Sequence, residues 1–287
     1  MKKFYIFYHN YIQEPRAQKL FNAAKENGLE PRLVIANDLI FKDGEIFYND
    51  EKISFTPKNL YWTISSTLTL ETVAFIGSLN NTPVYPLNNA SAYVDKYRTQ
   101  CFFTSINIPT PSTTLISTTD YQRYTKDLGD YPYVLKKTHS SAGKAVELIY
   151  SFEEIEEFIQ KNQVIKKVPL KINSFILQKF IPESAGTDYR VLCIKDQVLG
   201  IIKRTAKSGF KSNFSLGGSV EYIEKNEEME KMSRKIMQKS GLFMAGIDFI
   251  KSDNGYLAIE INPSPQFEGF EKATGINVAN RIIEALL

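Results

Sequence analysis

Residues 246–262 combine acidic side chains with a turn signal and carry the most specific chemistry in the sequence. Two alternating apolar runs flank the letters SDNG, and this pattern predicts a β-hairpin. We expect a three-residue loop at 253–255, with Gly255 in its left-handed position. Counting outward from that loop places Asp248 directly opposite Glu260, with their Cβ atoms about 5 Å apart.

Asn262 lies two residues beyond Glu260, so its side chain is expected on the same face of the hairpin. Two facing carboxylates are destabilising unless a cation lies between them. Two carboxylates and an amide oxygen are hard-oxygen ligands of the kind that Mg²⁺ prefers, especially when phosphates complete its shell. The alternative is an acidic strand face that only contacts water, and the register of the three residues favours the metal site.

Basic residues gather in two other places. Lys136 ends the predicted strand YPYVLKK before a Ser/Gly loop, where a lysine and loop amides can neutralise phosphate oxygens together. Alternation places Lys137 on the opposite face of that strand, and Lys96, after Asp95, is ambiguous by itself. A denser group spans two predicted strands joined by a turn at Asp196-Gln197, namely Arg190, Lys203, Arg204, Lys207 and Lys211. Arg190 and Arg204 could line a cleft with the hairpin, or the whole group could be a solvated basic face.

The elements that must position these residues follow from periodicity. A strand, a helix from Pro15 to Gly28 and a second strand predict a small open α/β lobe, with no GxGxxG dinucleotide signal. The helix places Ala17, Leu20, Phe21 and Ala24 on one face. A Pro- and Asn-rich stretch at 82–91 marks a boundary, after which strands and hairpins dominate. Later helices are predicted with the apolar faces Val94, Tyr97 and Cys101; Ile155, Phe158 and Ile159 (capped by Ser151 and Glu154); and Met229, Met232 and Ile236. A C-terminal helix is predicted after the last hairpin.

Composition narrows the class of protein. The chain has 287 residues, 43% of them hydrophobic, and a net charge of +3, which argues against bulk nucleic-acid or membrane-surface binding. Cys101 and Cys193 are too few for a disulfide framework, so we expect both to be reduced core residues. His9 and His139 lack the partners of a metal site or a Cys/His nucleophile, and no serine triad is evident. Without a signal peptide or membrane span, a cytoplasmic location is expected.

Three segments resemble the ATP-grasp superfamily, and within it the RimK-like ligases of the alpha-L-glutamate ligase type. They are AGTDYRVLCIKDQVLGIIKRTAKSGFKSNFSLGGSVE, GIDFI followed by AIEINPSPQFEGFEKATGINVA, and, more weakly, VDKYRTQ with YPYVLKKTHSSAGKAV. The resemblance covers residues 83–287 well and the N-terminal lobe loosely. It implies an ATP-grasp fold, α/β and α+β, in which two α+β lobes clamp ATP behind a small α/β domain. The implied domains are 1–88 and 89–287, the latter with lobes of about 89–180 and 181–287.

The resemblance also implies roles for individual residues. The phosphate-binding lysines would be Lys96 and Lys136, and the linker meeting the adenine through main-chain groups would be Gln178, Lys179 and Phe180. Further nucleotide contacts would come from Asp188, Lys211, Ser212 and Asn213, and the cations near the acyl phosphate would be Arg190 and Arg204. The family's magnesium ligands match Asp248, Glu260 and Asn262, in agreement with the hairpin.

The implied activity is ATP-dependent joining of a carboxylate to an amine through an acyl phosphate, with ATP and Mg²⁺, or Mn²⁺ in its place. The implied partners are an acidic amino acid or peptide carboxylate and an amine acceptor; nucleic acid and membrane are not expected, and a homo-oligomer is compatible. Two alternatives stay open, a small-molecule kinase and a non-catalytic ATP-binding module. Lys179 stands where the family has an acid, SSAGKAV has few glycines, and Thr63 and Gln266-Phe267 depart from the pattern in ways that could change the acceptor.

Overall fold

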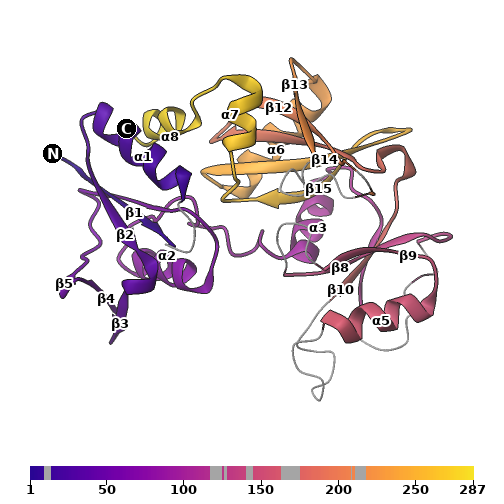
Figure 1. The fold of residues 1–287 in the computed structure, drawn as a ribbon, viewed down its shortest axis with the longest axis horizontal. Coiled ribbons are helices and arrows are strands. Elements are labelled where there is room, and N and C mark those ends of the chain that lie inside the picture. The colour runs from indigo at the N-terminus through magenta and orange to yellow at the C-terminus, as the bar shows by residue number, and fades with distance from the viewer. Residues whose placement is uncertain are drawn as a thin grey trace.

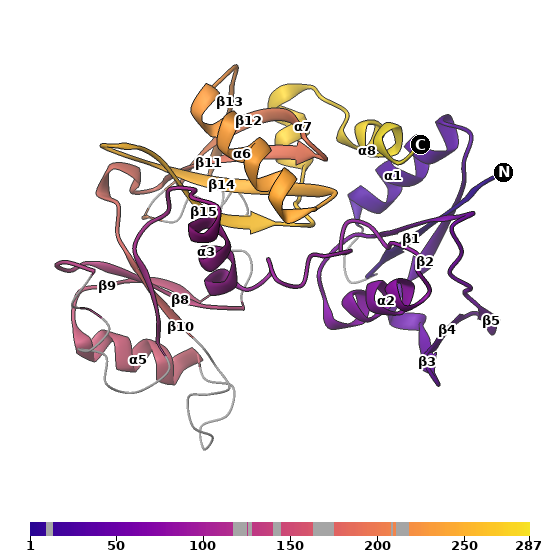
Figure 2. The same cartoon turned by 180° about the vertical axis from the view of Figure 1, so that it is seen from behind.

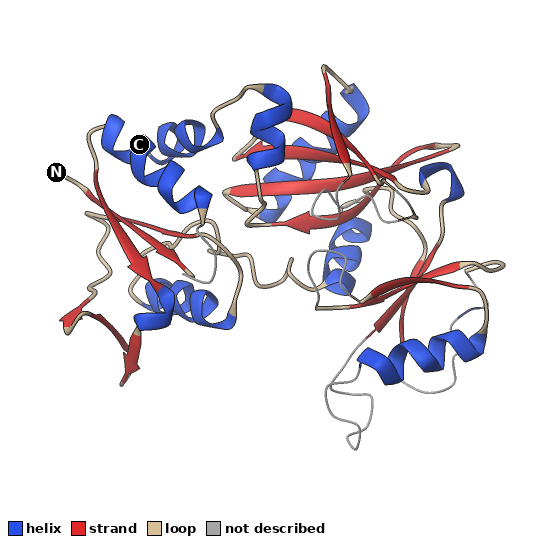
Figure 3. Cartoon of the chain, in the orientation of Figure 1, coloured by secondary structure: helices blue, strands red, loops and turns tan. Residues whose placement is uncertain are grey.

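The structure is a computed structural model that describes residues 1–9, 14–116, 125, 128–139, 145–162, 175–207, 209–210 and 218–287. Within these residues the strands form four sheets (Figures 1 and 3). In the order in which they begin along the chain, we call them the N-terminal sheet, the small hairpin sheet, the middle sheet and the large sheet. Helices lie against the N-terminal, middle and large sheets (Figure 3).

The N-terminal sheet is parallel, with the strand order β2-β1-β6. Its elements are β1 (Lys3–Tyr8), α1 (Pro15–Glu26), β2 (Glu30–Ile35), η1 (Ala36–Asp38), β6 (Leu60–Thr63) and α2 (Leu68–Leu79). The small hairpin sheet consists of β3 (Ile40–Lys42), β4 (Glu45–Tyr48) and β5 (Glu51–Lys52). Pro15 lies in the first turn of α1, and Ala17, Leu20 and Ala24 are buried as their spacing predicts. The βαβ start is therefore confirmed.

The middle sheet is antiparallel, with the order β7-β10-β8-β9. Its elements are β7 (Thr113–Ile116), β8 (Tyr133–Lys137), β9 (Val146–Ile149), α5 (Phe152–Asn162) and β10 (Phe175–Lys179). Leu135 and Leu177 lie on the face that α5 covers, where they pack with Phe158. Lys136 follows Leu135, so alternation directs its side chain to the other face.

The large sheet has the order β13-β12-β11-β14-β15. Its elements are η3 (Pro182–Ser184), β11 (Thr187–Ile194), β12 (Gln197–Thr205), β13 (Ser219–Ile223), α6 (Glu227–Ser240), β14 (Met244–Ser252) and β15 (Gly255–Asn262), followed by α7 (Glu268–Thr274) and α8 (Val278–Leu286). The buried α6 residues Met229, Met232 and Ile236 share a core with Val191 and Ile247, as their spacing predicts. Helix α8 returns the chain to the N-terminal part, where it lies beside α1 (Figure 1).

Helix α3 (Lys96–Ser105) lies between the large sheet and the middle sheet in both views (Figures 1 and 2). Its buried residues are Lys96, Thr99, Gln100 and Phe103. This is an i, i+3, i+4, i+7 face, so the predicted inward face of Val94, Tyr97 and Cys101 is wrong. The reason is that polar side chains of α3 are directed at the charged residues of the large sheet. Consequently Cys101 is exposed, not a core residue, whereas Cys193 is buried as expected.

One smaller prediction also changes. The β11–β12 turn consists of Lys195 and Asp196, because Ile194 pairs with Gln197, so its predicted position was one residue late. No helix in the described ranges is long and apolar enough to cross a membrane. The division into domains at residues 88 and 180 stays a prediction.

Candidate active site

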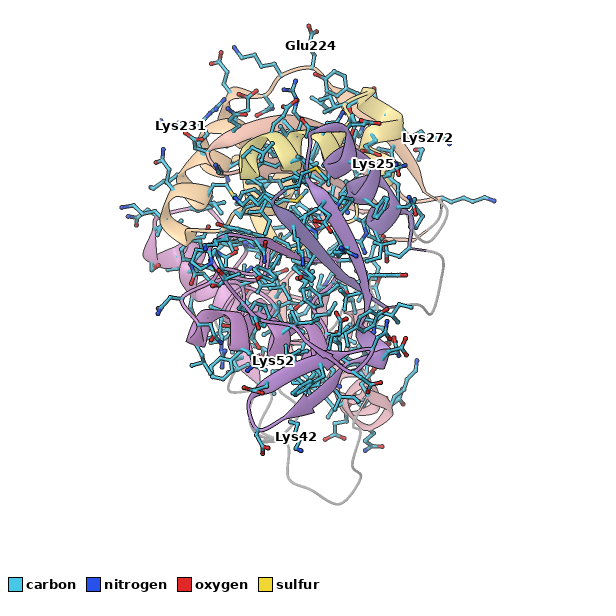
Figure 4. All side chains as sticks on the ribbon, turned by 90° about the vertical axis from the view of Figure 1, so that its left-hand side faces the viewer. Lys25, Lys42, Lys52, Glu224, Lys231 and Lys272 are labelled. Atoms are coloured by element: carbon cyan, nitrogen blue, oxygen red, sulfur yellow. The ribbon has the colours of Figure 1, made fainter. Side chains whose placement is uncertain are left out.

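Five charged residues lie on one face of the large sheet, and we call them the charged row: Asp188, Arg190, Arg204, Asp248 and Glu260. The sheet register pairs Arg190 with Asp248 and Asp248 with Glu260, across β11, β14 and β15. It pairs Asp188 with Arg204 across β11 and β12. Paired residues share a face, and Asp188 and Arg190 are two residues apart on one strand, so all five side chains project the same way. Figure 4 shows other charged side chains, such as Lys42, Glu224 and Lys231, extending from the rim of the molecule.

The hairpin places Asp248 opposite Glu260 by a different route from the predicted one. Ser252 pairs with Gly255, so the loop has two residues, and the predicted three-residue loop is wrong. Gly255 has a φ of +110°, a region that favours glycine. Between Asp248 and Phe249 the register shifts by one residue, because a β-bulge in β15 inserts Ile259. The extra residue compensates for the shorter loop, and the predicted opposition of Asp248 and Glu260 is confirmed.

The bulge is held by groups outside the sheet. Ala258 donates its backbone N–H to Pro109 O at 2.8 Å, and the Thr110 hydroxyl donates to Ala258 O at 2.8 Å. Gln100 Nε2 donates to Ile259 O at 3.5 Å. These contacts satisfy backbone groups that the disrupted ladder leaves open on an edge strand. They therefore fix the segment that aims Glu260.

Asp248 is buried and is contacted by two guanidinium groups. Arg190 donates to both of its oxygens, from Nε at 2.7 Å and from Nη2 at 2.8 Å, and Arg204 Nη2 lies 3.0 Å from Oδ2. Burial alone raises the pKa of Asp248, but Arg190 and Arg204 outweigh it, and the net pKa lies below the usual range of an aspartate. Asp248 is thus ionised and rigidly oriented at neutral pH.

Arg204 bridges two acids. Its Nε and Nη2 donate to the two oxygens of Asp188 at 2.5 and 2.8 Å, and the same Nη2 reaches Asp248. Burial lowers the pKa of Arg204, but Asp248 and Asp188 raise it by more, so the guanidinium stays charged. Since Asp188 directs both oxygens at Arg204, it orients this arginine, and its direct contact with a nucleotide stays a prediction.

Glu260 and Asn262 complete a donor set that fits a divalent metal. The Glu260 side chain is 33% exposed, and its Oε1 lies 3.7 Å from Lys96 Nζ. Asn262 Nδ2 donates to Asp248 Oδ2 at 3.3 Å and to Gly246 O at 3.5 Å, which turns Oδ1 away from these groups and leaves it for a cation. The described residues contain no group of three His, Cys, Asp or Glu side chains that could hold a metal by themselves. Two carboxylates and one amide oxygen fit Mg²⁺, whose remaining ligands are commonly water and substrate phosphates.

Two lysines face the charged row from the opposite side. Lys96 is the first residue of α3, whose N-cap is Asp95, and its backbone N–H donates to Thr138 O at 3.0 Å, just past β8. Lys136 Nζ donates to Gln178 Oε1 at 2.7 Å. Burial lowers the pKa of Lys136 to about 8; Glu260 opposes this shift and Lys96 adds to it. The charges that act on Lys136 therefore include Lys96 and acids of the charged row, and the binding of phosphate by these lysines stays a prediction.

The lowered pKa of Lys136 predicts a pH dependence. Below about pH 8 the ammonium is charged and can bind a phosphate, and above it the amine becomes neutral. We expect kcat/KM for ATP, which reports the free enzyme, to fall as the pH rises through 8. Lys136→Arg keeps its charge at every accessible pH and should lose this fall, although its absolute rate can differ. A pH–rate profile from 6 to 10 measures both; the same fall in the arginine variant would assign it to another group.

Other predicted residues lie at the edge of this arrangement or away from it. Lys179 is exposed at the end of β10, with its backbone N–H donated to Ser112 O at 2.9 Å, and the Phe180 ring packs edge-on against Phe210. Lys203 alternates with Arg204 and so projects to the opposite face of the large sheet, while Lys207 is exposed. Lys203 therefore does not share a face with Arg190 and Arg204, whereas these two arginines lie on one face with the hairpin acids, as one of the two alternatives predicted. Three of the predicted nucleotide contacts lie outside the described residues: Lys211, Ser212 and Asn213.

The residues at which the sequence departs from the family pattern, Thr63 and Gln266-Phe267, lie in different environments. Thr63 is fully buried at the end of β6, and its backbone N–H donates to Tyr85 O at 2.6 Å. Phe267 is buried in the core beneath the loop that follows Asn262, whereas Gln266 is exposed. Of these three side chains, only Gln266 is exposed.

The middle and large sheets, with the two lysines on one side of the site and the charged row on the other, define a protein of the ATP-grasp class. The chain belongs to the RimK-like ATP-grasp family, whose domain matches residues 93–286. The resemblance stated from the sequence and the predicted fold class are thereby confirmed, and the protein is an ATP-dependent carboxylate–amine ligase.

Relatives by sequence include the probable alpha-L-glutamate ligase of Legionella pneumophila (strain Corby), 33% identical over 229 residues, which cover 77% of this chain and 73% of the relative. The probable alpha-L-glutamate ligase 1 of Shewanella frigidimarina is 31% identical over 226 residues, with coverage of 77% and 73%. Among solved structures, the RimK domain ATP-grasp protein of Sphaerobacter thermophilus has a TM-score of 0.74 at 18% identity and covers 98% of both chains. The ATP-grasp ligase PsnB, complexed with a precursor variant, Mg and ADP, has a TM-score of 0.71 at 17% identity, covering 100% of this chain and 98% of its own. At these identities the two structures show the shared fold.

Proposed function

We propose that this ligase binds ATP with Mg²⁺, or with Mn²⁺ in its place, between the charged row and the two lysines, and joins an acidic amino acid or peptide to an amine. The observation that supports this most is that Lys96 and Lys136 approach Glu260 and Asp248 from α3 and the middle sheet. ATP would supply the phosphoryl group: an oxygen of the substrate carboxylate would attack the γ-phosphorus, ADP would leave, and an acyl phosphate would result. The amine would then attack the acyl carbon, and phosphate would leave as the amide forms.

The side chains divide this work. Lys96 and Lys136 donate hydrogen bonds to phosphate oxygens and offset their charge. The metal is held by Glu260, Asp248 and Asn262. Main-chain groups of Lys179 and Phe180 contact the adenine. Gln178, assigned to that linker from the sequence, also places its side chain beside Lys136. We place Lys211, Ser212 and Asn213 at the nucleotide by resemblance alone.

The two arginines have different shares in this proposal. Arg204 is the more buried, at 6% side-chain exposure, and serves to hold Asp188 and Asp248 in place. Arg190 is 15% exposed and lies nearer to the open face, so we assign it the offset of charge on the reacting carboxyl group. Both arginines are paired with acids, and among the described residues of the site four cations face three carboxylates. This excess of positive charge is smaller than the sequence predicted.

The acidic character of the substrate rests mainly on the relatives, which are named probable alpha-L-glutamate ligases. Arginine beside an open face also favours bidentate carboxylate recognition. We expect glutamate, aspartate and peptides ending in them to give the fastest ADP release, with turnover falling as salt rises. Lys203→Gln and Lys207→Gln, whose side chains lie off the row, should keep the same preference. A preference for neutral or cationic compounds that ignores salt would refute the acidic substrate and leave the ligase assignment intact.

A further inference from the structure

The ammonium group of Lys136 belongs to a hydrogen-bonded chain that ends on the backbone. Lys136 Nζ donates to Gln178 Oε1 at 2.7 Å, and Gln178 Nε2 donates to Thr113 Oγ1 at 2.8 Å. The Thr113 hydroxyl in turn donates to Pro111 O at 2.8 Å. Gln178 is only 3% exposed, so these contacts are shielded from competing water.

The proton count along this chain permits one orientation of the Gln178 amide. The single hydrogen of the Thr113 hydroxyl is directed at Pro111 O, so toward Gln178 the hydroxyl can only accept. Lys136 can only donate. A flipped amide would place its oxygen against the acceptor and its NH₂ group against the ammonium, two unfavourable contacts in a buried place. Lys136 therefore meets the oxygen of the amide, and Thr113 holds its nitrogen in place at the other end.

The strand register keeps the three side chains together. Gln178 pairs with Thr113 across β7 and β10, while Lys136 pairs with Ile176 across β8 and β10. Ile176 and Gln178 alternate on one strand, so all three side chains share the face that looks toward the charged row. The sequence contains no motif around Thr113 that marks it, and its importance follows from this register.

We propose that Thr113 is a positioning residue that aims Lys136 at the nucleotide phosphates by fixing the Gln178 amide. The proposal rests on the phosphate-binding role assigned to Lys136 above. Without the threonine hydroxyl, the buried Gln178 Nε2 loses its acceptor. The amide can then swing away from β7 and carry its oxygen, and with it the Lys136 ammonium, out of the phosphate position. The effect on nucleotide affinity should pass through Lys136 alone.

The segment that carries Thr113 also offers a matched control. Thr110 lies three residues away, and its hydroxyl donates to the bulge at Ala258, on the metal side of the site. Thr110→Val and Thr113→Val remove the same hydroxyl from the same segment, and valine suits strand β7, which Thr113 begins. In the absence of metal, only Thr113→Val should alter the binding of a nucleotide.

The test is calorimetric titration of the full chain with ADP in EDTA, so that neither turnover nor metal contributes. We expect Thr113→Val to weaken ADP binding by roughly five- to tenfold, the usual effect of one unsatisfied buried hydrogen bond. Thr113→Ser, which keeps a hydroxyl at this position, should bind ADP with an affinity within about twofold of that of the unsubstituted chain. Thr110→Val should bind ADP with the same affinity as the unsubstituted chain. Added to Lys136→Met, the Thr113→Val change should cause no further loss, because the two act as one unit.

Each other outcome is decisive. Unchanged affinity in Thr113→Val, or equal losses in the serine and valine variants, overturns the positioning role. Losses that add in the double variant show that Thr113 acts independently of Lys136 and overturn it as well, while leaving the role of Lys136 intact. If Lys136→Met itself binds ADP normally, the phosphate role proposed for this lysine fails, and the positioning role fails with it.

Discussion

Glu260→Ala is expected to lower kcat on the order of 10³-fold while the protein stays folded, because it removes a proposed metal ligand that stabilises transition-state charge. The Glu260 side chain is partly exposed, and Lys96, its nearest described ion-pair partner, lies at 3.7 Å. Truncation therefore removes a partly exposed carboxylate whose ion pair with Lys96 is long. Steady-state ADP release and a thermal unfolding curve of the same sample measure both parts of this prediction.

Asp253→Ala is the matched control, since Asp253 is an exposed acid in the loop of the same hairpin. It should retain nearly full activity. A Glu260→Ala enzyme that unfolds at the normal temperature and turns over at a comparable rate would exclude the metal site on this hairpin. Asp248 is a poorer choice, because its removal leaves Arg190 and Arg204 without their shared partner, and breaking such a buried pair typically costs about 3–5 kcal/mol.

Lys136→Met is expected to lower kcat/KM for ATP by about 10- to 100-fold, the usual worth of a charge-assisted hydrogen bond in a shielded site. Lys137→Met should change it by less than about twofold, since alternation directs Lys137 to the face that α5 covers. The two variants remove the same group from adjacent residues of β8, so general effects on charge or folding cancel. Initial rates at varied ATP concentration separate them, and equal losses in both would contradict the assignment of Lys136 to the phosphates.

The hairpin shows how far local sequence rules reach. Alternating apolar residues around SDNG identified both strands and the facing acids, because period-2 patterning is a local property. The bulge at Ile259 could not be predicted, since Pro109, Thr110 and Gln100 stabilise it from segments about 150 residues away in the chain. The facing of Asp248 and Glu260 was predicted from a loop one residue too long, and the bulge compensates for the error.

Helix α3 and the basic residues show where the same rules fail. Apolar spacing suggested that Tyr97 and Cys101 face inward, but the helix packs against a charged site, so it buries Lys96 and Gln100 instead. Composition grouped Lys203 with Arg204, although adjacent strand residues project to opposite faces. A chain's list of cations does not reveal which of them are paired. The ion pairs that Asp188 and Asp248 make with Arg204 and Arg190 depend on a strand order that the sequence does not display.

The central claim is that ATP is cleaved to activate a carboxylate for attack by an amine. Incubation with ATP, Mg²⁺ and a mixture of acidic amino acids and peptides, followed by mass spectrometry and nucleotide chromatography, tests it most directly. We predict ADP and phosphate in equal amounts with a new amide, and a hydroxamate when hydroxylamine replaces the amine. AMP with pyrophosphate, or ADP with a stable phosphorylated product and no need for an amine, would contradict the claim.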